Sequence, residues 1–261
     1  LYYRCGVPHG AMGNAVFVME ATEPLPVRVG TLPALKTSSW NDRDYAGIGT
    51  NKSAAHFIGG TSLHYLEAAD HADWTLGSGD FSIEYWINVN AAGFNRLLGH
   101  TAHNAGGTRE GWNYAHDTGG GRLTWSTDGD NEYLEGVAAT NVPPGQWGHY
   151  VLVRNGTNLK FYENGKQISS STDGDLGTIY NSTEPLTIGA MNQSGTMTTG
   201  SMLDGFLGEI SLWTTEFNAN TVIEHYQTGR AGNQLTANSS CKLYLKADST
   251  YGDTTFVDVS S

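Results

Sequence analysis

A chain of 261 residues can bury a substantial core as one main domain with extensions. Its 34 glycines and a charged fraction of only 15% favour many short strands joined by tight turns over long charged helices. The net charge of −12, without any Arg/Lys cluster, argues against nucleic acid as a partner, and no apolar run approaches the ~20 residues that cross a bilayer, which argues against a membrane partner.

Residues 1–53 are predicted to form an extended N-terminal arm. The prolines at Pro8, Pro24, Pro26 and Pro33 surround one short apolar run at 15–19, and proline disfavours the interior of a helix or a sheet. An arm of this kind is expected to pack on another surface rather than to form its own domain.

From residue 54 onward, short apolar segments alternate with clusters of Gly, Asn, Asp and Ser. In 81–89 the apolar residues recur at every second position from Phe81 to Val89, and a period of two places one row on one face of a strand. We expect this row to face the apolar row of 147–163 across a shared core. Further strands are predicted at 54–58, 63–67, 95–99, 121–126, 147–154, 158–163, 166–169, 185–189 and 205–213.

Two Asn-Gly pairs predict a three-stranded meander between residues 147 and 169. Asn155-Gly156 and Asn164-Gly165 separate apolar runs, and Asn-Gly supplies the positive φ that a tight turn needs.

One helix is predicted near 218–229, lying as a lid on a sheet edge. Asn218 or Asn220 would cap its start and Gly229 would end it. In the remaining residues, 231–261, further strands are expected at 243–245 and 256–257. These strands would either complete the domain or start another module.

Several motifs follow one another between residues 54 and 230: Tyr65-Leu66, Ala72-Asp-Trp74, Gly77 to Trp86, Gly145 to Arg154, Leu159 to Lys166, Leu186 to Gly189 and Gly205 to Trp213. Their order resembles the laminin-G-like domains of the concanavalin A-like lectin/glucanase superfamily. The resemblance implies an all-β fold in which residues 54–230 form a two-sheet antiparallel jelly-roll sandwich with one short helix.

The tail segments 242–248 and 253–258 are similar to the strand that begins such modules in structural proteins of marine phages and environmental bacteria. This resemblance implies a virion or extracellular protein, such as a tail, fibre or capsid-decorating subunit. Its expected partners are copies of itself or other structural subunits, bound through the N-terminal arm and the C-terminal tail by strand addition. Surface glycans are the other expected partner.

Four residues are candidates for glycan contact: Trp112, Tyr114, Trp125 and Asn131. They flank segments rich in amides and carboxylates that the sequence suggests are loops, and flat rings stack on the C–H face of a sugar while amides fix its hydroxyls. The alternative is that these rings fill the space between the two sheets.

Calcium is the one cofactor that the sequence suggests. Asp128, Asp130 and Glu132 place oxygen ligands at alternate positions of a turn, as a hard cation requires, but Tyr133 and Ala139 stand at the sixth and twelfth positions and exclude an EF-hand loop. The alternative is a solvated acidic turn. Cys5 and Cys241 are candidates for a disulfide that joins the two ends of the chain, and two unrelated buried thiols are the alternative.

Catalysis is not expected. Retaining glycosidases need two carboxylates about 5 Å apart. The sequence has no Glu-x-Asp-x-x-Glu motif, Glu132 and Glu135 would point to opposite faces of a strand, and Glu84 and Glu209 stand alone in apolar strands. The sequence therefore predicts a non-catalytic recognition or assembly module. A secreted lectin-like adhesin is the alternative, and a glycoside hydrolase of the same fold ranks last.

Overall fold

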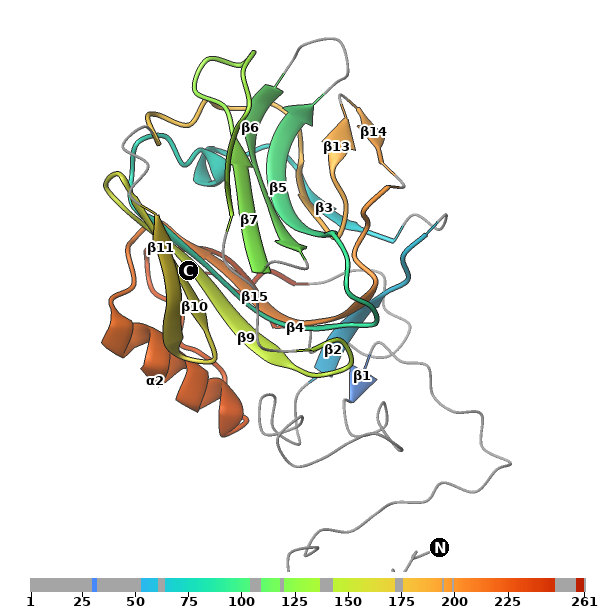
Figure 1. Cartoon of the computed structure of the whole chain (residues 1–261), viewed down its shortest axis with the longest axis vertical. Coiled ribbons are helices and arrows are strands. Elements are labelled where there is room, and N and C mark those ends of the chain that lie inside the picture. Colours follow the sequence, from blue (N-terminus) through green and yellow to red (C-terminus); the bar gives the residue numbers. More distant parts are fainter. Residues whose placement is uncertain are drawn as a thin grey trace, which may run out of the picture.

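Two antiparallel sheets pack face to face in the computed structural model (Figure 1). The structure describes residues 30–31, 53–60, 64–103, 109–117, 120–136, 143–171, 176–193, 195–198, 200–246 and 257–260. The predicted all-β two-sheet sandwich is confirmed. None of the helices in these ranges is both long enough and apolar enough to span a bilayer.

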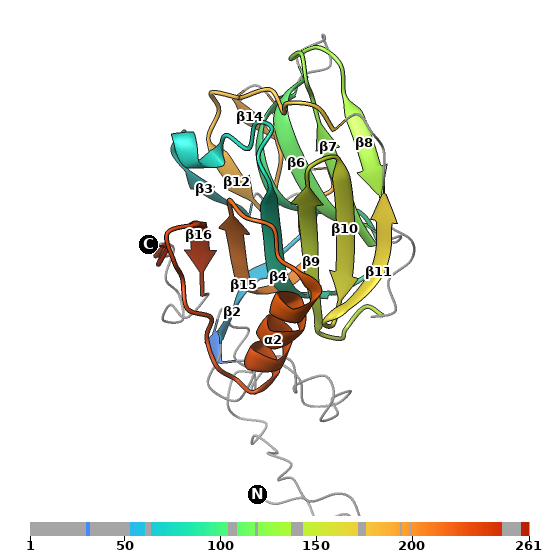
Figure 2. The same ribbon diagram turned by 90° about the vertical axis from the view of Figure 1, so that its left-hand side faces the viewer.

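The larger sheet has eight strands in the order β1-β2-β15-β4-β9-β10-β11, with β16 also paired to β15 (Figure 2). Their bounds are β1 Gly30–Thr31, β2 Ser53–Phe57, β4 Phe81–Val89, β9 Gly148–Asn155, β10 Asn158–Glu163, β11 Lys166–Ser171, β15 Gly205–Trp213 and β16 Cys241–Leu245. The predicted meander forms β9, β10 and β11, and the turn after β10 has positive φ at Asn164 and Gly165.

The smaller sheet has six strands in the order β3-β12-β5-β6-β7-β8. Their bounds are β3 Leu66–Ala68, β5 Asn95–His103, β6 Arg109–Asp117, β7 Gly120–Trp125, β8 Tyr133–Gly136 and β12 Leu186–Ile188. A short hairpin of β13 (Asn192–Gln193) and β14 (Thr196–Met197) lies beside β5, and a 3₁₀ turn, η2 (Ala72–Trp74), precedes β4.

The prediction that 81–89 and 147–163 face each other across the core is wrong. β4 pairs directly with β9, for example Tyr85 with Tyr150, so these rows lie side by side in one sheet. The opposite wall of the core comes from the six-stranded sheet, including Leu98 and Leu123. Periodicity identifies the face of a strand but not the sheet to which the strand belongs.

β6 and β8 occupy segments where the sequence predicts no strands. In β6, Gly111 has φ +76° and a Cβ there would lie 1.8 Å from the carbonyl oxygen of His100. This glycine and the charged residues at both ends of the segment are typical of loops, which explains why the strand is not evident from sequence.

β4 is buried on both faces. Its inward row belongs to the core between the sheets, and the alternate row is covered as well, namely Ser82, Glu84, Trp86 and Asn88. Glu84 and Trp86 lie against α2 (Ala219–Arg230), whereas Ser82 contacts the connection before the helix and Asn88 contacts Gly145. The helix lies across the outer face of the eight-stranded sheet and not on its edge as predicted (Figures 1 and 2).

The sequence of α2 fits its position against the sheet. Asn218 caps the first turn, because its Oδ1 accepts a hydrogen bond from the Thr221 amide at 3.0 Å. Gly229 does not end the helix as predicted; a Cβ there would lie 2.7 Å from the Trp86 indole, so glycine permits close packing. The chain instead leaves the helix through Gly232, which has φ +80°.

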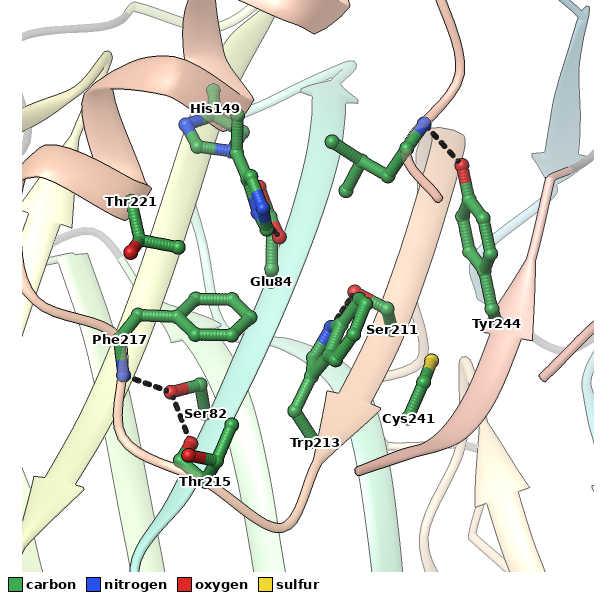
Figure 3. A network of polar contacts seen from close by, with 12 residues as sticks. Ser82, Glu84, His149, Ser211, Trp213, Thr215, Phe217, Thr221, Cys241 and Tyr244 are labelled. Carbon is green, nitrogen blue, oxygen red and sulfur yellow. Dashed lines mark hydrogen bonds and ion pairs between the residues drawn. The ribbon is translucent and has the colours of Figure 1, made fainter. Parts of the chain in front are cut away.

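Polar contacts join the sheet to the segment around α2 (Figure 3). Glu84 Oε1 lies 2.6 Å from His149 Nε2 on β9, and Glu84 Oε2 lies 2.9 Å from His225 Nδ1 on α2. Ser82 Oγ donates to Thr215 O at 2.8 Å and accepts from the Phe217 amide at 3.0 Å. These contacts fix both the helix and the strand-to-helix connection.

The two imidazoles decide the charge of Glu84. Burial alone would raise the pKa of Glu84, but hydrogen bonds from His149 and His225 lower it to about 2. Burial alone would lower the pKa of His225, but Glu84, assisted by Glu224 and Glu209, raises it above its ordinary value. Glu84 and His225 therefore form a buried ion pair at mildly acidic pH.

Arg154, at the end of β9, joins three connecting segments. The side chain is buried, and its guanidinium donates to Gly156 O at 2.9 Å, Gly77 O at 3.0 Å and Gly177 O at 2.6 Å. A planar fork of donors suits three carbonyl groups that point in different directions. This one side chain holds the turns before β4, after β9 and before β12.

Both ends of the described chain return to the larger sheet. Gly30–Thr31 of the arm pairs with β2, while 1–29 and 32–52 lie outside the described residues. β16 pairs with β15, the Tyr244 amide donates to Asp258 Oδ1 at 2.8 Å, and Leu245 forms a bridge with Asp258. The segment from 231 onward thus contributes a strand to this sheet.

The pH dependence of stability should report the contact between Glu84 and His225. The lowered pKa of Glu84 stabilises the fold above pH ~4.3, and this contribution is lost as pH falls towards 2. The raised pKa of His225 stabilises the fold below pH ~6.5, and this contribution is lost as pH rises through the folded-state value. We expect the contribution of this contact, measured by urea titration as the stability difference between the unchanged protein and a variant that lacks His225, to be largest between about pH 4.3 and 6.5.

The variant His225→Phe should lower the free energy of unfolding by about 1.5–3 kcal/mol at pH 5.5, because a hydrogen bond to a charged group is lost. This loss of stability should shrink as pH rises above ~6.5. The control Gln227→Phe introduces the same ring at an exposed position of α2 and should leave the pH profile intact. A loss of stability in His225→Phe that stays constant above pH ~6.5 would contradict the assignment.

Arg154→Met should destabilise the fold by about 2–4 kcal/mol, because it removes three charge-assisted hydrogen bonds from a buried site. Arg154→Lys keeps the charge but loses the fork geometry, so its free energy of unfolding should lie between those of the unchanged protein and Arg154→Met. The exposed Lys166→Met serves as the control for a lost surface cation. Thermal and urea unfolding measure the differences, and equal stability of Arg154→Met and Lys166→Met would show that the three carbonyl contacts are dispensable.

Candidate functional site

The outer face of the six-stranded sheet carries polar side chains. Arg96 pairs with Ala115 and Ala115 with Arg122, while Asn113 pairs with Thr124. Directly paired residues point to the same side of a sheet, so these side chains share one face. We refer to Arg96, Asn113, Arg122 and Thr124 as the polar face.

Asn113 lies at the centre of the polar face and is only 3% exposed. Its Oδ1 accepts a hydrogen bond from Arg96 Nη1 at 2.6 Å, and its backbone carbonyl accepts one from Thr124 Oγ1 at 3.3 Å. Its Nδ2 lies over Gly99, where a Cβ would come within 2.4 Å of that nitrogen. Within the described part of the chain Nδ2 has no hydrogen-bond partner, and such a buried donor costs about 1–3 kcal/mol.

Two arginines meet over the ring of Phe94. The guanidinium carbon lies 4.5 Å from the ring centroid for Arg96 and 5.0 Å for Arg122, within the ~6 Å range of cation–π contacts. Burial, together with the charge of Arg122, lowers the pKa of Arg96 to about 10, so the guanidinium stays charged at neutral pH. Arg122 Nη1 lies 3.7 Å from Asp117 Oδ2.

A hollow of about 480 Å³ opens beside Arg96. Its other walls come from the β13–β14 hairpin and its flanks, namely Met191, Gln193, Met197, Thr198 and Gly200. A separate cavity of about 10 Å³, lined in part by Asn113, Thr124 and Met191, could hold one water molecule. The hollow falls in the size range of ligand sites, about 300–1,000 Å³, and methionine side chains adapt to irregular surfaces.

His103 and Glu132 lie at the edge of the polar face and line the same small cavity. His103 Nδ1 is 3.7 Å from Glu132 Oε2. Burial lowers the pKa of His103, and the charge of Arg109 lowers it further, so the imidazole is neutral at pH 7. The edge therefore offers neutral imidazole and carboxylate groups next to the arginines.

Trp112, Tyr114 and Trp125 belong to the core and do not offer ring faces to a ligand. They are 1%, 1% and 3% exposed, and Trp112 Nε1 donates to Trp74 O at 3.0 Å inside the protein. Their prediction as stacking residues is wrong, because they occupy the inward positions of β6 and β7. The alternative, that these rings fill the space between the sheets, is correct.

The acidic turn does not bring its carboxylates together. Asp128 Oδ1 accepts hydrogen bonds from the amides of Asp130 and Asn131, and Asp128 Oδ2 accepts one from Asn131 Nδ2 at 2.6 Å. These bonds lower the pKa of Asp128, and Glu132 turns towards His103. No cluster of three metal-ligating side chains occurs among the described residues, so the predicted calcium site of Asp128, Asp130 and Glu132 does not assemble.

The other residues considered in the sequence are the glycan candidate Asn131, the two cysteines and the two strand glutamates. Asn131 is exposed, and its amide is engaged by Asp128. Cys241 is a buried thiol that lies 3.4 Å from Leu243 O, whereas Cys5 lies outside the described residues, so the disulfide stays a prediction. Glu84 and Glu209 are 3% and 4% exposed on the face that α2 covers.

The polar face is not evident from the sequence as a site, although a signal for part of it exists. Asn113 stands between Trp112 and Tyr114, and Thr124 stands between Leu123 and Trp125. Such polar positions between core positions identify the outward row of a strand. The pairing of Arg96 with Arg122 across β6 carries no comparable signal, because it depends on the order of strands in the sheet.

Comparison with known proteins gives a family and several similar folds. A family model described as "Concanavalin A-like lectin/glucanases superfamily", of the laminin-G type, matches residues 60–223. A search of curated protein sequences finds no match. The chain spans about half, 51%, of the binding domain of Paraclostridial Mosquitocidal Protein 1, with 74% of this chain covered, 14% identity and a TM-score of 0.49.

Two further solved structures resemble the chain. The carbohydrate-binding module CBM40 of the Ruminococcus gnavus IT-sialidase, bound to α2,3-sialyllactose, has 14% identity and a TM-score of 0.51, covering 66% of this chain and 96% of that one. The SAP-like pentraxin of Limulus polyphemus has 13% identity and a TM-score of 0.50, covering 78% and 90%. At these identities the likeness concerns the fold alone. Because the family model spans more than half of the sequence, the chain belongs to the concanavalin A-like lectin/glucanase superfamily.

Proposed function

We propose that this chain is a non-catalytic glycan-binding module that holds its ligand against the polar face and in the hollow beside Arg96. The observation that carries this proposal is the hollow of about 480 Å³, whose wall includes Arg96, with the guanidinium of Arg96 held by the buried amide oxygen of Asn113. A ligand-sized hollow lined by a guanidinium, an amide and a hydroxyl suits a hydroxyl-rich ligand.

The chemistry of the walls supports a sugar. Gln193 and Thr198 supply amide and hydroxyl groups for sugar hydroxyls, while Met191 and Met197 supply apolar surface for C–H groups. The superfamily name covers lectins as well as glucanases, and a structural neighbour is a carbohydrate-binding module bound to a sialylated sugar. These likenesses support binding as the role of the fold here.

The placement of two strand carboxylates supports binding without catalysis. Glu84 is enclosed beneath α2 and held by His149 and His225, and Glu209 is buried on the same covered face. A glycosidase needs its carboxylates at the glycosidic bond. Release of reducing ends from soluble β-glucans would revive the hydrolase alternative.

A second proposed role is assembly in a virion or an extracellular structure. The arm segment Gly30–Thr31 adds a strand to β2 at the edge of the larger sheet. The same pairing made between neighbouring copies would link subunits by strand addition. This role is compatible with glycan binding, because β2 belongs to the eight-stranded sheet and the polar face belongs to the six-stranded sheet.

Asn113→Ala and Gln193→Ala should each weaken glycan binding by at least about tenfold, the effect of losing about 1.4 kcal/mol. A glycan array identifies ligands, and calorimetry on the hits measures affinity. Asn131→Ala is the matched control, because it removes an exposed amide outside the polar face. Loss of binding in Asn131→Ala but not in Asn113→Ala would place the ligand at the acidic turn, and silence across diverse glycans would exclude the glycan role.

Strand addition by the arm predicts self-association of the whole chain. Light scattering coupled to size exclusion should show a mass that rises with concentration, and Thr31→Pro should reduce this rise because proline cannot donate to a ladder. The control Thr236→Pro makes the same substitution at another exposed position. A monomer at every concentration would count against the assembly role.

A further inference from the structure

The polar face concentrates positive charge in an acidic protein. The chain carries a net charge of −12, yet Arg96 and Arg122 meet over one ring, Phe94. Two like charges at this separation repel each other, and the repulsion costs more where solvent is excluded. Burying one of them partly and placing the other beside it is therefore unfavourable for the unliganded protein.

Little in the described structure offsets this cost. Within the described ranges, no carboxylate lies within 4.0 Å of the Arg96 guanidinium, and Arg122 approaches Asp117 only at 3.7 Å, which is too long for a hydrogen bond. The charge of Glu132 acts on Arg96 from beyond that distance and offsets part of the repulsion. Among the described residues, the two guanidinium groups thus lack a directly hydrogen-bonded carboxylate.

We propose that Arg96 and Arg122 recognise an anionic group on the bound sugar, a carboxylate or a sulfate ester. This inference rests on the proposed glycan-binding function and names the class of glycan, an acidic saccharide. Guanidinium groups bind such anions with charge-assisted hydrogen bonds, often in pairs. The anion would supply a directly bonded negative charge, whereas Glu132 acts on Arg96 only from beyond hydrogen-bond distance.

The surroundings favour a saccharide with a few charges over other anions. The hollow beside Arg96 has walls of methionine, glutamine and threonine, which suit a sugar ring more than an isolated phosphate. A long polyanion such as nucleic acid would be repelled by the net charge of −12 once it extended beyond the two arginines. The ligand therefore presents its charge locally and its remaining contacts through hydroxyl groups.

Matched pairs of oligosaccharides test the inference with the full chain. One pair is oligogalacturonate and its methyl ester, and the other is a sulfated galactose oligomer and its desulfated form. We expect the charged member of at least one pair to bind at least about tenfold more tightly in calorimetry, with an advantage that shrinks as salt is raised because salt screens the charges. The two pairs distinguish a carboxylate from a sulfate.

Arg96→Gln and Arg122→Gln should each remove most of the advantage of the charged probe, measured as the ratio of the charged-probe affinity to the neutral-probe affinity of the same variant. Arg230→Gln makes the same change in net charge at an exposed position on α2 and should bind like the unchanged protein. Arg96→Lys, which keeps the charge, should retain part of the advantage and shows whether a loss in Arg96→Gln reflects charge or misfolding. Thermal melts check the fold of each variant.

The outcomes separate the two proposals. If charged and neutral probes bind equally, or if Arg96→Gln and Arg122→Gln weaken both kinds alike, the acidic-saccharide inference is overturned and glycan binding stands. If none of the probes and no glycan on the array binds, the proposed function falls and this inference falls with it. A charge-dependent preference lost in both variants and kept in Arg230→Gln would establish the inference.

Discussion

The burial of β4 on both faces is the constraint on which the rest of the structure depends. One face completes the core between the sheets, and the other would expose Trp86 and Glu84 if α2 did not cover it. A buried carboxylate is tolerated only when it is paired, and His149 and His225 provide the pairing from a neighbouring strand and from the helix. The contact that neutralises Glu84 therefore also fixes the helix.

Coverage of the larger sheet determines where a ligand can approach. Because α2 occupies the outer face of the eight-stranded sheet, we propose the polar outer face of the six-stranded sheet and the hollow beside the β13–β14 hairpin as the recognition surface. On the same strands, Trp112 and Trp125 pack inward, and Asn113 and Thr124 face outward. Alternation along a strand thus separates the residues that form the core from those of the proposed binding face.

Cations in this acidic chain are placed in two different ways. Arg154 is matched by three carbonyl oxygens, so its charge is distributed over hydrogen bonds that hold connecting segments together. Arg96 and Arg122 have fewer partners and lie beside each other. Donors that carbonyl groups satisfy indicate a structural role, whereas we propose that the two neighbouring guanidinium groups bind an anion, because among the described residues neither has a directly hydrogen-bonded carboxylate.

The sequence by itself determined the all-β class, most strand positions, the meander of β9 to β11 and the capped start of α2, because these follow from local periodicity, Asn-Gly turns and a capping asparagine. Tertiary structure decided that β4 lies beside β9, that Trp112 faces the core and that Gly229 packs on Trp86. It also brought Arg96 next to Arg122. The physical reason is that a period of two gives each strand two faces, while only the pairing of distant strands decides which face is covered and which charges become neighbours.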